Sequence, residues 1–150
     1  MVKILLALTG LVAAVDKDFS CSTNKGSFKI TYAQAQAAAK AGGVDRGLSR
    51  YSSYPHPFHG GSGSGTYKIV FYDIPDKQCN RGQGLLEYPV YSDGTAWEKQ
   101  KLVKDIKKKT PARVVYLQHN LKICGVMVHV IEDKGTGQGS GDFRVCDKVK

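Results

Sequence analysis

The sequence lacks several features that would place the protein in other classes. It has no C-x-x-C pair, the spacing that a tetrahedral zinc site would use, although it holds four cysteines. It has no internal repeat and no apolar run close to the roughly 20 residues that a membrane-spanning helix requires. We therefore expect no metal site, no cofactor and no membrane-spanning segment.

Acidic residues are scarce relative to basic ones. The chain has 22 Lys and Arg against 13 Asp and Glu, which gives a formal net charge of +9. Excess positive charge attracts polyanions over long distances, and these include RNA, acidic membrane surfaces and acidic cell-wall polymers. The charge therefore indicates a class of partner and leaves the activity open.

The first 14 residues have the pattern of a secretory signal peptide. A basic start at Lys3 precedes an apolar run over residues 4–12 and a Val12-Ala13-Ala14 exit. A membrane anchor is the alternative, but the run is too short, and charged residues follow it at once. We expect cleavage after Ala14, a secreted product, and one compact domain over residues 15–150. Loss of Lys3 alone would leave a mature charge of about +8.

Four cysteines in a secreted chain of this size favour two disulfides. Counting alone leaves three possible pairings. A bridge between Cys21 and Cys146 would tie both termini together and stabilise the fold by about 4 to 5 kcal/mol in the chain-entropy model.

Turn residues and helix-capping signals outline the first half of the domain. Residues 21–30 favour a hairpin around a turn at Asn24-Lys25-Gly26. Thr31 and Gln34 form a T-x-x-Q capping box ahead of an alanine-rich helix over residues 33–41, which Gly42-Gly43 ends.

Two further segments have weaker structural signals. Residues 95–109 are weakly helical or irregular, and the Gly/Ser-rich residues 60–65 form a flexible loop. A phosphate-binding loop is the alternative for residues 60–65, but the Lys-Ser/Thr that should follow is absent.

Three segments rich in branched and aromatic residues are predicted strands: residues 85–91, 112–117 and 123–131. We expect an α+β domain in which the N-terminal hairpin and the single helix pack on a twisted antiparallel sheet. Long loops and two disulfides complete it. Side-chain alternation would place Cys124, Val126, Val128 and Val130 on the core face of the last strand. Its other face would then carry Ile123, Gly125, Met127 and His129.

The same alternation gives each strand one polar residue on its other face: Glu87, Arg113 and His129. If the strands are neighbours, these side chains meet and suit cleavage of an RNA phosphodiester. A base takes the proton of the 2′-hydroxyl, an acid protonates the leaving 5′-oxygen, and positive charge stabilises the phosphorane. DNA lacks the hydroxyl and would not react. Taken singly, the residues would be assigned to a surface ion pair and a strand histidine.

Five motifs occur in order along the chain. They are Ser53-Tyr54-Pro55-His56; Leu85-Leu86-Glu87-Tyr88-Pro89 with Asp93-Gly94; Pro111-Ala112-Arg113-Val114-Val115-Tyr116; Cys124-Gly125-Val126-Met127-Val128-His129; and Phe143 three residues before Cys146. In this combination the sequence resembles the guanyl-specific fungal ribonucleases and, more closely, the ribotoxins of the alpha-sarcin and hirsutellin type. A single motif would be weak evidence, whereas five in order are specific.

The resemblance implies a role for each matched residue. Glu87 matches the general base, His129 the general acid, and Arg113 the phosphate-stabilising arginine. Tyr54 and His56 match residues that hydrogen-bond the reacting phosphate and the 2′-oxygen.

The resemblance also covers the rest of the framework. Phe143 matches the apolar residue packed beside the site, and the cysteines match the pairings Cys21–Cys146 and Cys79–Cys124. Ribotoxins cut one phosphodiester in the sarcin-ricin loop of the large ribosomal RNA, which stops translation.

The sequence departs from these families in segments that would contact RNA. Where guanyl-specific relatives carry an acidic residue that reads guanine, this chain has His59-Gly60-Gly61-Ser62, and we expect His59 to assist at the cleft. A lysine-dense connection ahead of Arg113 is predicted to contact RNA phosphates, although such runs usually form solvated surface. Its members are Lys99, Lys101, Lys104, Lys107, Lys108 and Lys109.

The sequence thus predicts a secreted, monomeric, metal-independent endoribonuclease that leaves a 2′,3′-cyclic phosphate. Ribosomal RNA is its leading target, and acidic membranes are a further partner during entry into a target cell. Two alternatives stay open: a general extracellular guanyl-preferring ribonuclease, and a non-catalytic ribonuclease-like effector that binds host RNA or protein. Retention of Glu87, Arg113 and His129 argues against the second.

Overall fold

The computed structural model describes residues 17–61, 68–74 and 76–149. The predicted signal peptide and residues 62–65 of the predicted flexible loop lie outside the described residues. Within those three ranges, no helix is long and apolar enough to cross a membrane.

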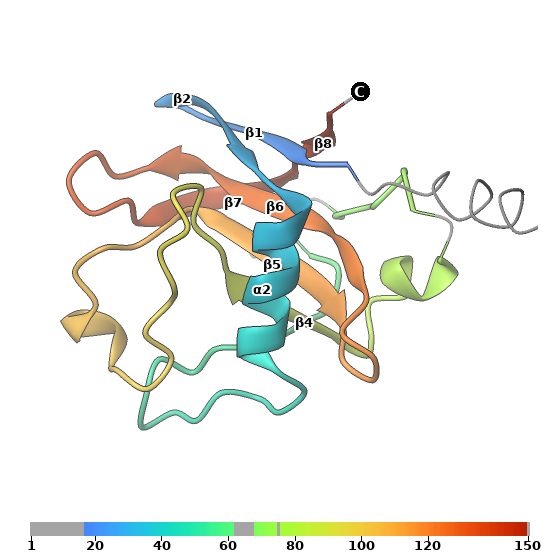
Figure 1. The fold of residues 1–150 in the computed structure, drawn as a ribbon, viewed down its shortest axis with the longest axis horizontal. Helices are drawn as coiled ribbons and strands as arrows, with labels where there is room; N and C mark the ends of the chain where they lie inside the picture. The colour runs from blue at the N-terminus through green and yellow to red at the C-terminus, as the bar shows by residue number, and fades with distance from the viewer. Residues whose placement is uncertain (1–16, 62–67, 75, 150) are drawn as a thin grey trace, which may run out of the picture.

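The chain begins with the predicted hairpin. Strand β1 (Phe19–Thr23) pairs antiparallel with β2 (Gly26–Ile30). Strand β8 (Asp147–Lys148) pairs with the other edge of β1, so the two ends of the described chain lie side by side (Figure 1). The disulfide between Cys21 and Cys146 joins β1 to the residue just before β8, and the implied pairing is confirmed.

Helix α2 (Tyr32–Gly42) begins and ends where the sequence predicts. The Thr31 hydroxyl accepts from the Gln34 backbone N–H, and the Gln34 side chain accepts from the Thr31 N–H, so both halves of the capping box form. At the other end, the N–H of Gly43 donates to Ala39, and Gly43 has φ 76°, a region that favours glycine. The buried face of the helix packs on the sheet.

The main sheet has five antiparallel strands in the order β3-β4-β5-β6-β7. They are β3 (His56–Phe58), β4 (Leu85–Pro89), β5 (Ala112–Leu117), β6 (Ile123–Glu132) and β7 (Gly139–Val145). The three central strands are the predicted ones, within two residues at their ends. The sequence does not predict the edge strands, because Pro57 and the glycines at 139 and 141 interrupt a strand pattern.

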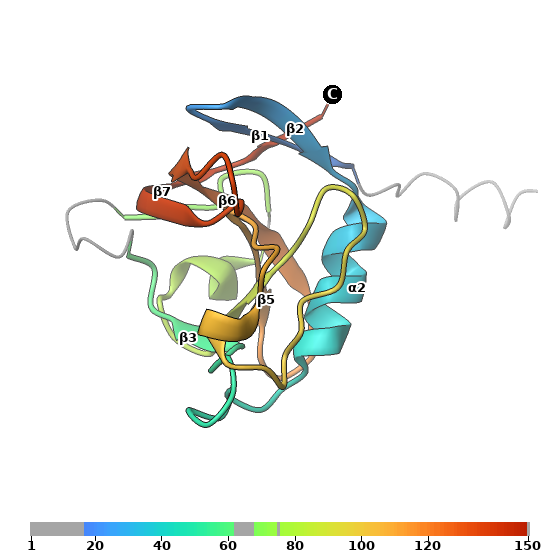
Figure 2. The ribbon, with the colours of Figure 1, turned by 90° about the vertical axis from the view of Figure 1, so that its left-hand side faces the viewer.

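Both faces of the sheet are covered (Figure 2). Helix α2 covers one face, where Leu86, Val114 and Val126 belong to the larger core. On the other face a second core contains Leu85, Val115 and Met127, together with Cys79 of the 3-10 helix η1 (Lys77–Asn80). The second core covers only part of that face, and the remainder holds the polar residues of the site.

The prediction for the start of β6 is wrong at two residues. The register shifts beside Tyr116, which pairs with Ile123 where a regular ladder would continue with Cys124. This bulge reverses the faces, so Ile123 lies in the helix-side core and Cys124 in the second core. There Cys124 forms the disulfide with Cys79, as the resemblance implied.

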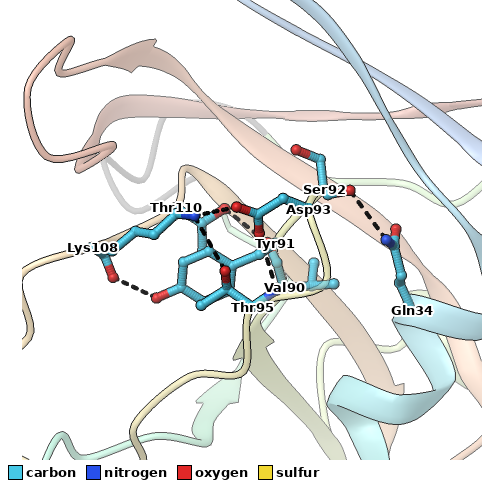
Figure 3. Close-up of polar contacts among 8 residues, drawn as sticks. All are labelled: Gln34, Val90, Tyr91, Ser92, Asp93, Thr95, Lys108 and Thr110. Atoms are coloured by element: carbon cyan, nitrogen blue, oxygen red, sulfur yellow. Dashed lines mark hydrogen bonds and ion pairs between the residues drawn. The ribbon is translucent and has the colours of Figure 1, made fainter.

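The connection between β4 and β5 is irregular apart from one 3-10 turn, η2 (Val103–Asp105). Its two ends are tied together (Figure 3). The Tyr91 hydroxyl donates to the carbonyl of Lys108 at 2.6 Å, and the Thr110 hydroxyl donates to the carbonyl of Val90 at 2.7 Å. These bonds fix the segment that leads into β5.

Candidate active site

Strand register brings the polar residues of the motifs onto one face of the sheet. Glu87 of β4 lies directly opposite His56 of β3, and His129 of β6 lies directly opposite Phe143 of β7. Arg113 lies on β5, the strand between β4 and β6, and pairs with Met127, two residues before His129. The predicted neighbourhood of the three central strands is therefore confirmed, with Glu87 and His129 on either side of the strand that carries Arg113.

Glu87 is buried, with 8% of its surface exposed. Burial disfavours the carboxylate and raises its pKa to about 7, although the positive charge of Arg113 acts in the opposite direction. A carboxyl group with this pKa exchanges its proton at neutral pH, which is what a general base requires.

Arg113 is also buried and is held by three protein oxygens. Its Nε donates to the Tyr54 hydroxyl at 3.1 Å, and its Nη1 donates to the carbonyls of Thr110 at 2.7 Å and Ala112 at 2.9 Å. A guanidinium has five N–H donors, so these bonds use three of them. The two on Nη2 are the ones that remain for a phosphate, since no bond within the described residues uses them.

The ring of His129 is fixed in one orientation. Its Nδ1 lies 3.0 Å from the Gly141 carbonyl, which only accepts, so Nδ1 carries the hydrogen and Nε2 is the nitrogen that can exchange a proton. The ring of Phe143 lies against it, with 3.9 Å between ring centroids. Burial lowers the pKa of His129, the Gly141 hydrogen bond raises it in part, and the charge of Arg113 lowers it further.

Tyr54 and His56 form the opposite wall of the site. Their rings stack with centroids 3.8 Å apart, and the Arg113 guanidinium lies 5.2 Å from the centre of the Tyr54 ring. Burial, and next the charge of Arg113, lower the pKa of His56. The buried Trp97 packs edge-on against Tyr54. Tyr54 is thus held from three sides with its hydroxyl directed at Arg113.

Comparisons with known proteins identify the family. The chain is 31% identical to ribonuclease mitogillin of Aspergillus fumigatus over 149 residues, which covers 88% of this chain and 81% of the relative. No family model matches the chain. The chain belongs to the fungal ribotoxins. Since these relatives are named ribonucleases, this chain is an endoribonuclease, and the residues described above are its candidate active site.

Solved ribotoxin structures share the fold. Hirsutellin A from Hirsutella thompsonii matches with a TM-score of 0.65 at 30% identity, over 89% of this chain and 100% of hirsutellin A. The ribotoxin restrictocin, solved in complex with a 29-mer sarcin/ricin domain RNA analog, matches with a TM-score of 0.62 at 24% identity, over 86% of this chain and 98% of that one. At 24% identity, the match to restrictocin shows a shared fold alone.

A cleft of about 240 Å³ adjoins the candidate site. Tyr54, His56 and Arg113 line it, together with Ser53 of the first motif and five residues that the motifs did not single out: Ser52, Trp97, Val103, Thr110 and Gln138. Lys109 completes the lining. Of those five residues, only Trp97 could have been noticed from the sequence, because it is the single tryptophan of the chain.

Ser52 organises the rear of this cleft. Its hydroxyl accepts from the indole N–H of Trp97 at 3.0 Å and donates to the carbonyl of Lys99 at 2.9 Å. It also lies 3.4 Å from the N–H of Tyr54. The serine is only 1% exposed, so these hydrogen bonds take the place of water for the Ser52 hydroxyl, the Trp97 indole N–H and the Lys99 carbonyl.

The six lysines of the 99–109 connection differ in their surroundings. The ammonium of Lys99 donates to the carbonyl of Gly42 at the end of α2, and Lys101 pairs with Glu98 at 2.7 Å. Lys108 pairs with Asp93 and also donates to Thr95 (Figure 3). The side chains of Lys104 and Lys107 are exposed, and Lys109 alone of the six lines the cleft.

His59 is not among the residues that line the cleft. Its side chain is exposed, and its Nδ1 lies 3.3 Å from the carbonyl of Gly82. Within the described residues, no group of three or more His, Cys, Asp or Glu side chains is placed to hold a metal ion.

Proposed function

We propose that this ribotoxin cuts a single phosphodiester of the sarcin-ricin loop in the large ribosomal RNA and thereby inhibits translation. The observation that carries the chemistry is the arrangement of Glu87 and His129 on the two sides of the Arg113 strand, with the pKa of Glu87 raised to about 7 and the pKa of His129 lowered from 6.5. One group is a base and the other an acid in the same pH range, and the positive charge sits on the strand between them.

The reaction is a transesterification. Glu87 removes the proton of the 2′-hydroxyl, and the 2′-oxygen attacks the adjacent phosphorus. The guanidinium of Arg113 stabilises the negative charge of the phosphorane, assisted by Tyr54 and His56. His129 donates the proton on Nε2 to the leaving 5′-oxygen, so the products are a 2′,3′-cyclic phosphate and a free 5′-hydroxyl.

Phe143 supports the acid. The ring lies against the imidazole and contributes to the burial that lowers the pKa of His129. A more acidic imidazolium gives up its proton more readily to the leaving oxygen.

Three observations favour ribosomal RNA as the substrate. The chain carries a formal net charge of +9, its relatives are ribotoxins, and restrictocin, which has the same fold, was solved with a sarcin/ricin RNA analog. We infer that the exposed lysines of residues 99–109 attract the RNA through their long-range charge, and that the protein acts as a monomer. Acidic membrane surfaces are the further partner that the charge favours.

The signal-peptide pattern of residues 1–14 supports secretion, followed by action in the cytosol of a target cell. N-terminal sequencing of protein recovered from the culture medium of an expressing fungus should begin at Val15. An intact Met1 in the medium, or retention in the cell, would contradict the proposal.

The decisive experiment compares intact ribosomes with naked RNA. The mature protein should release one discrete fragment from the large-subunit RNA of intact ribosomes, ending in a cyclic phosphate detectable by mass spectrometry. Glu87→Gln and His129→Gln should each slow the release by on the order of 10² to 10⁴. Glu98→Gln, which removes an exposed carboxylate, is the matched control. Indiscriminate degradation would indicate a general ribonuclease, and no cleavage would indicate a binding protein.

A further inference from the structure

The cleft extends away from the proton-transfer pair. Of the residues on the catalytic face it is lined by Tyr54, His56 and Arg113, whereas Glu87 and His129 are not part of its lining. A reacting phosphate that contacts Arg113, Tyr54 and His56 would occupy the side of the cleft that these residues form, and the neighbouring part of the RNA chain would extend toward Lys109. The cleft has a volume of about 240 Å³, and Ser52, Trp97 and Arg113 belong to its buried part.

The lining of the cleft is positive. Lys109 and Arg113 contribute two cationic groups, Ser53 and Gln138 contribute polar groups, and no carboxylate lines it. A second cavity of about 360 Å³ lies on the other side of residues 109 and 110, but Asp93 and Glu132 line that one. Carboxylates repel a phosphate, so of the two cavities beside Lys109 the catalytic cleft is the one that suits an anionic ligand.

Hydrogen bonds and a tightly packed turn hold the backbone at Lys109 in place. The N–H of Lys109 donates to the Thr136 carbonyl at 2.8 Å. Lys108 and Thr110, its two neighbours, are bonded to Tyr91 and Val90 (Figure 3). A Cβ added at residue 137, which is glycine with φ +81°, would come 2.3 Å from the Lys109 carbonyl, so this turn packs tightly against the segment.

A second contact holds the same segment from the side of loop 91–95. Asp93 pairs with the ammonium of Lys108, and the helix residue Gln34 donates to the carbonyl of Ser92 at 3.1 Å (Figure 3). Lys108 is thereby occupied by a carboxylate, while Lys109 makes no ion pair within the described residues. The fold uses one lysine to fasten the segment and leaves the next one at the cleft.

We propose that Lys109, with the cleft beside Arg113, forms a second phosphate subsite that binds the phosphodiester next to the one that is cut. The inference rests on the proposed ribonuclease function and deepens it. A fixed cation that binds a phosphate one nucleotide away would hold the RNA chain in register with the reacting groups. It also assigns unequal roles to six lysines that look alike in the sequence.

The test compares substrates that differ in the number of phosphates. Lys109→Gln keeps a polar side chain and removes the charge. It should lower kcat/KM about tenfold for an RNA pentanucleotide and leave the rate on a dinucleoside monophosphate at the wild-type value, because a dinucleoside monophosphate has no second phosphate. Lys29→Gln, an exposed lysine of β2, removes the same charge as a control.

Binding is measured separately with a 2′-deoxy pentanucleotide, which cannot be cleaved. The slope of log affinity against log salt should be smaller in magnitude by about 0.7 for Lys109→Gln than for the wild type and for Lys29→Gln. Equal losses on both RNA substrates, no loss on either, or the same length-dependent loss in Lys107→Gln would overturn the subsite. If the wild type cuts neither RNA, the proposed function fails, and the 2′-deoxy binding data still decide whether Lys109 contacts a phosphate.

Discussion

Gly139 packs so closely on His129 that no side chain fits between them. A Cβ at residue 139 would lie 2.6 Å from Cδ2 of the His129 ring and 2.8 Å from the Cα of Pro111. Gly139→Ala should therefore displace the ring from its hydrogen bond to Gly141. Misplacement of a catalytic group by about 1 Å can cost about 10² in rate, so we expect a loss of that order in kcat, measured by single-turnover cleavage of RNA.

Gly135→Ala is the matched control for this change. It lies in the β6–β7 connection that leads to Gly139, and a Cβ there would meet only the Asp133 carboxylate at 3.5 Å, an ordinary contact. Its activity should equal that of the wild type. If Gly139→Ala also keeps full activity, the position of the ring does not limit the reaction.

The pH dependence of cleavage follows from the two displaced pKa values. Glu87 must be ionised and has a pKa of about 7, whereas His129 must be protonated and has a pKa lowered from 6.5. Because the pKa of Glu87 is the higher of the two, only a minority of molecules have an ionised Glu87 and a protonated His129 at the same time. The fraction of such molecules is greatest at a pH between the two pKa values. The profile of kcat/KM should be bell-shaped with its maximum on the acidic side of pH 7. A rate that keeps rising into the alkaline range would contradict these assignments.

Stability should depend on pH through Glu87. Its pKa is about 7 in the folded protein against 4.5 when exposed, so the folded state binds more protons across this window. The free energy of unfolding must then fall as pH rises through it. Glu87→Gln removes this titration. Between about pH 4 and pH 8, the free energy of unfolding of this variant should therefore increase by on the order of 3 kcal/mol relative to that of the wild type. Urea unfolding at a series of pH values measures this difference. If the free energy of unfolding depends on pH in the same way in both proteins, the raised pKa of Glu87 is contradicted.

Ser52→Ala should loosen the rear of the cleft. It leaves the buried indole N–H of Trp97 without its acceptor, which costs about 1 to 3 kcal/mol of unfolding free energy. Because Trp97 is the only tryptophan, its fluorescence reports directly on this site. Ser20→Ala, an exposed position on β1, should change neither the emission nor the stability. Unchanged thermal and chemical unfolding of Ser52→Ala would show that water replaces the hydroxyl.

Local signals in the sequence were sufficient for several elements. The capping box at Thr31 and the paired glycines after residue 41 define helix α2 within a few residues, because the signals act through neighbouring backbone groups. Alternation in three apolar segments placed Glu87, Arg113 and His129 on the correct faces, since the pleat alone determines that property. The bulge at Tyr116 was not predictable, because it depends on how β5 and β6 pair and not on the composition of either strand.

The sequence by itself determined which groups are the candidates for the chemistry and on which face of its strand each one lies. Only the tertiary structure decided that Glu87 is buried enough to titrate near pH 7, that Gly141 orients the ring of His129, and that Lys109 lines the cleft while Lys99 and Lys108 bind elsewhere. The reason is physical: a side chain's face follows from its own backbone, whereas its burial and partners come from residues distant in the sequence.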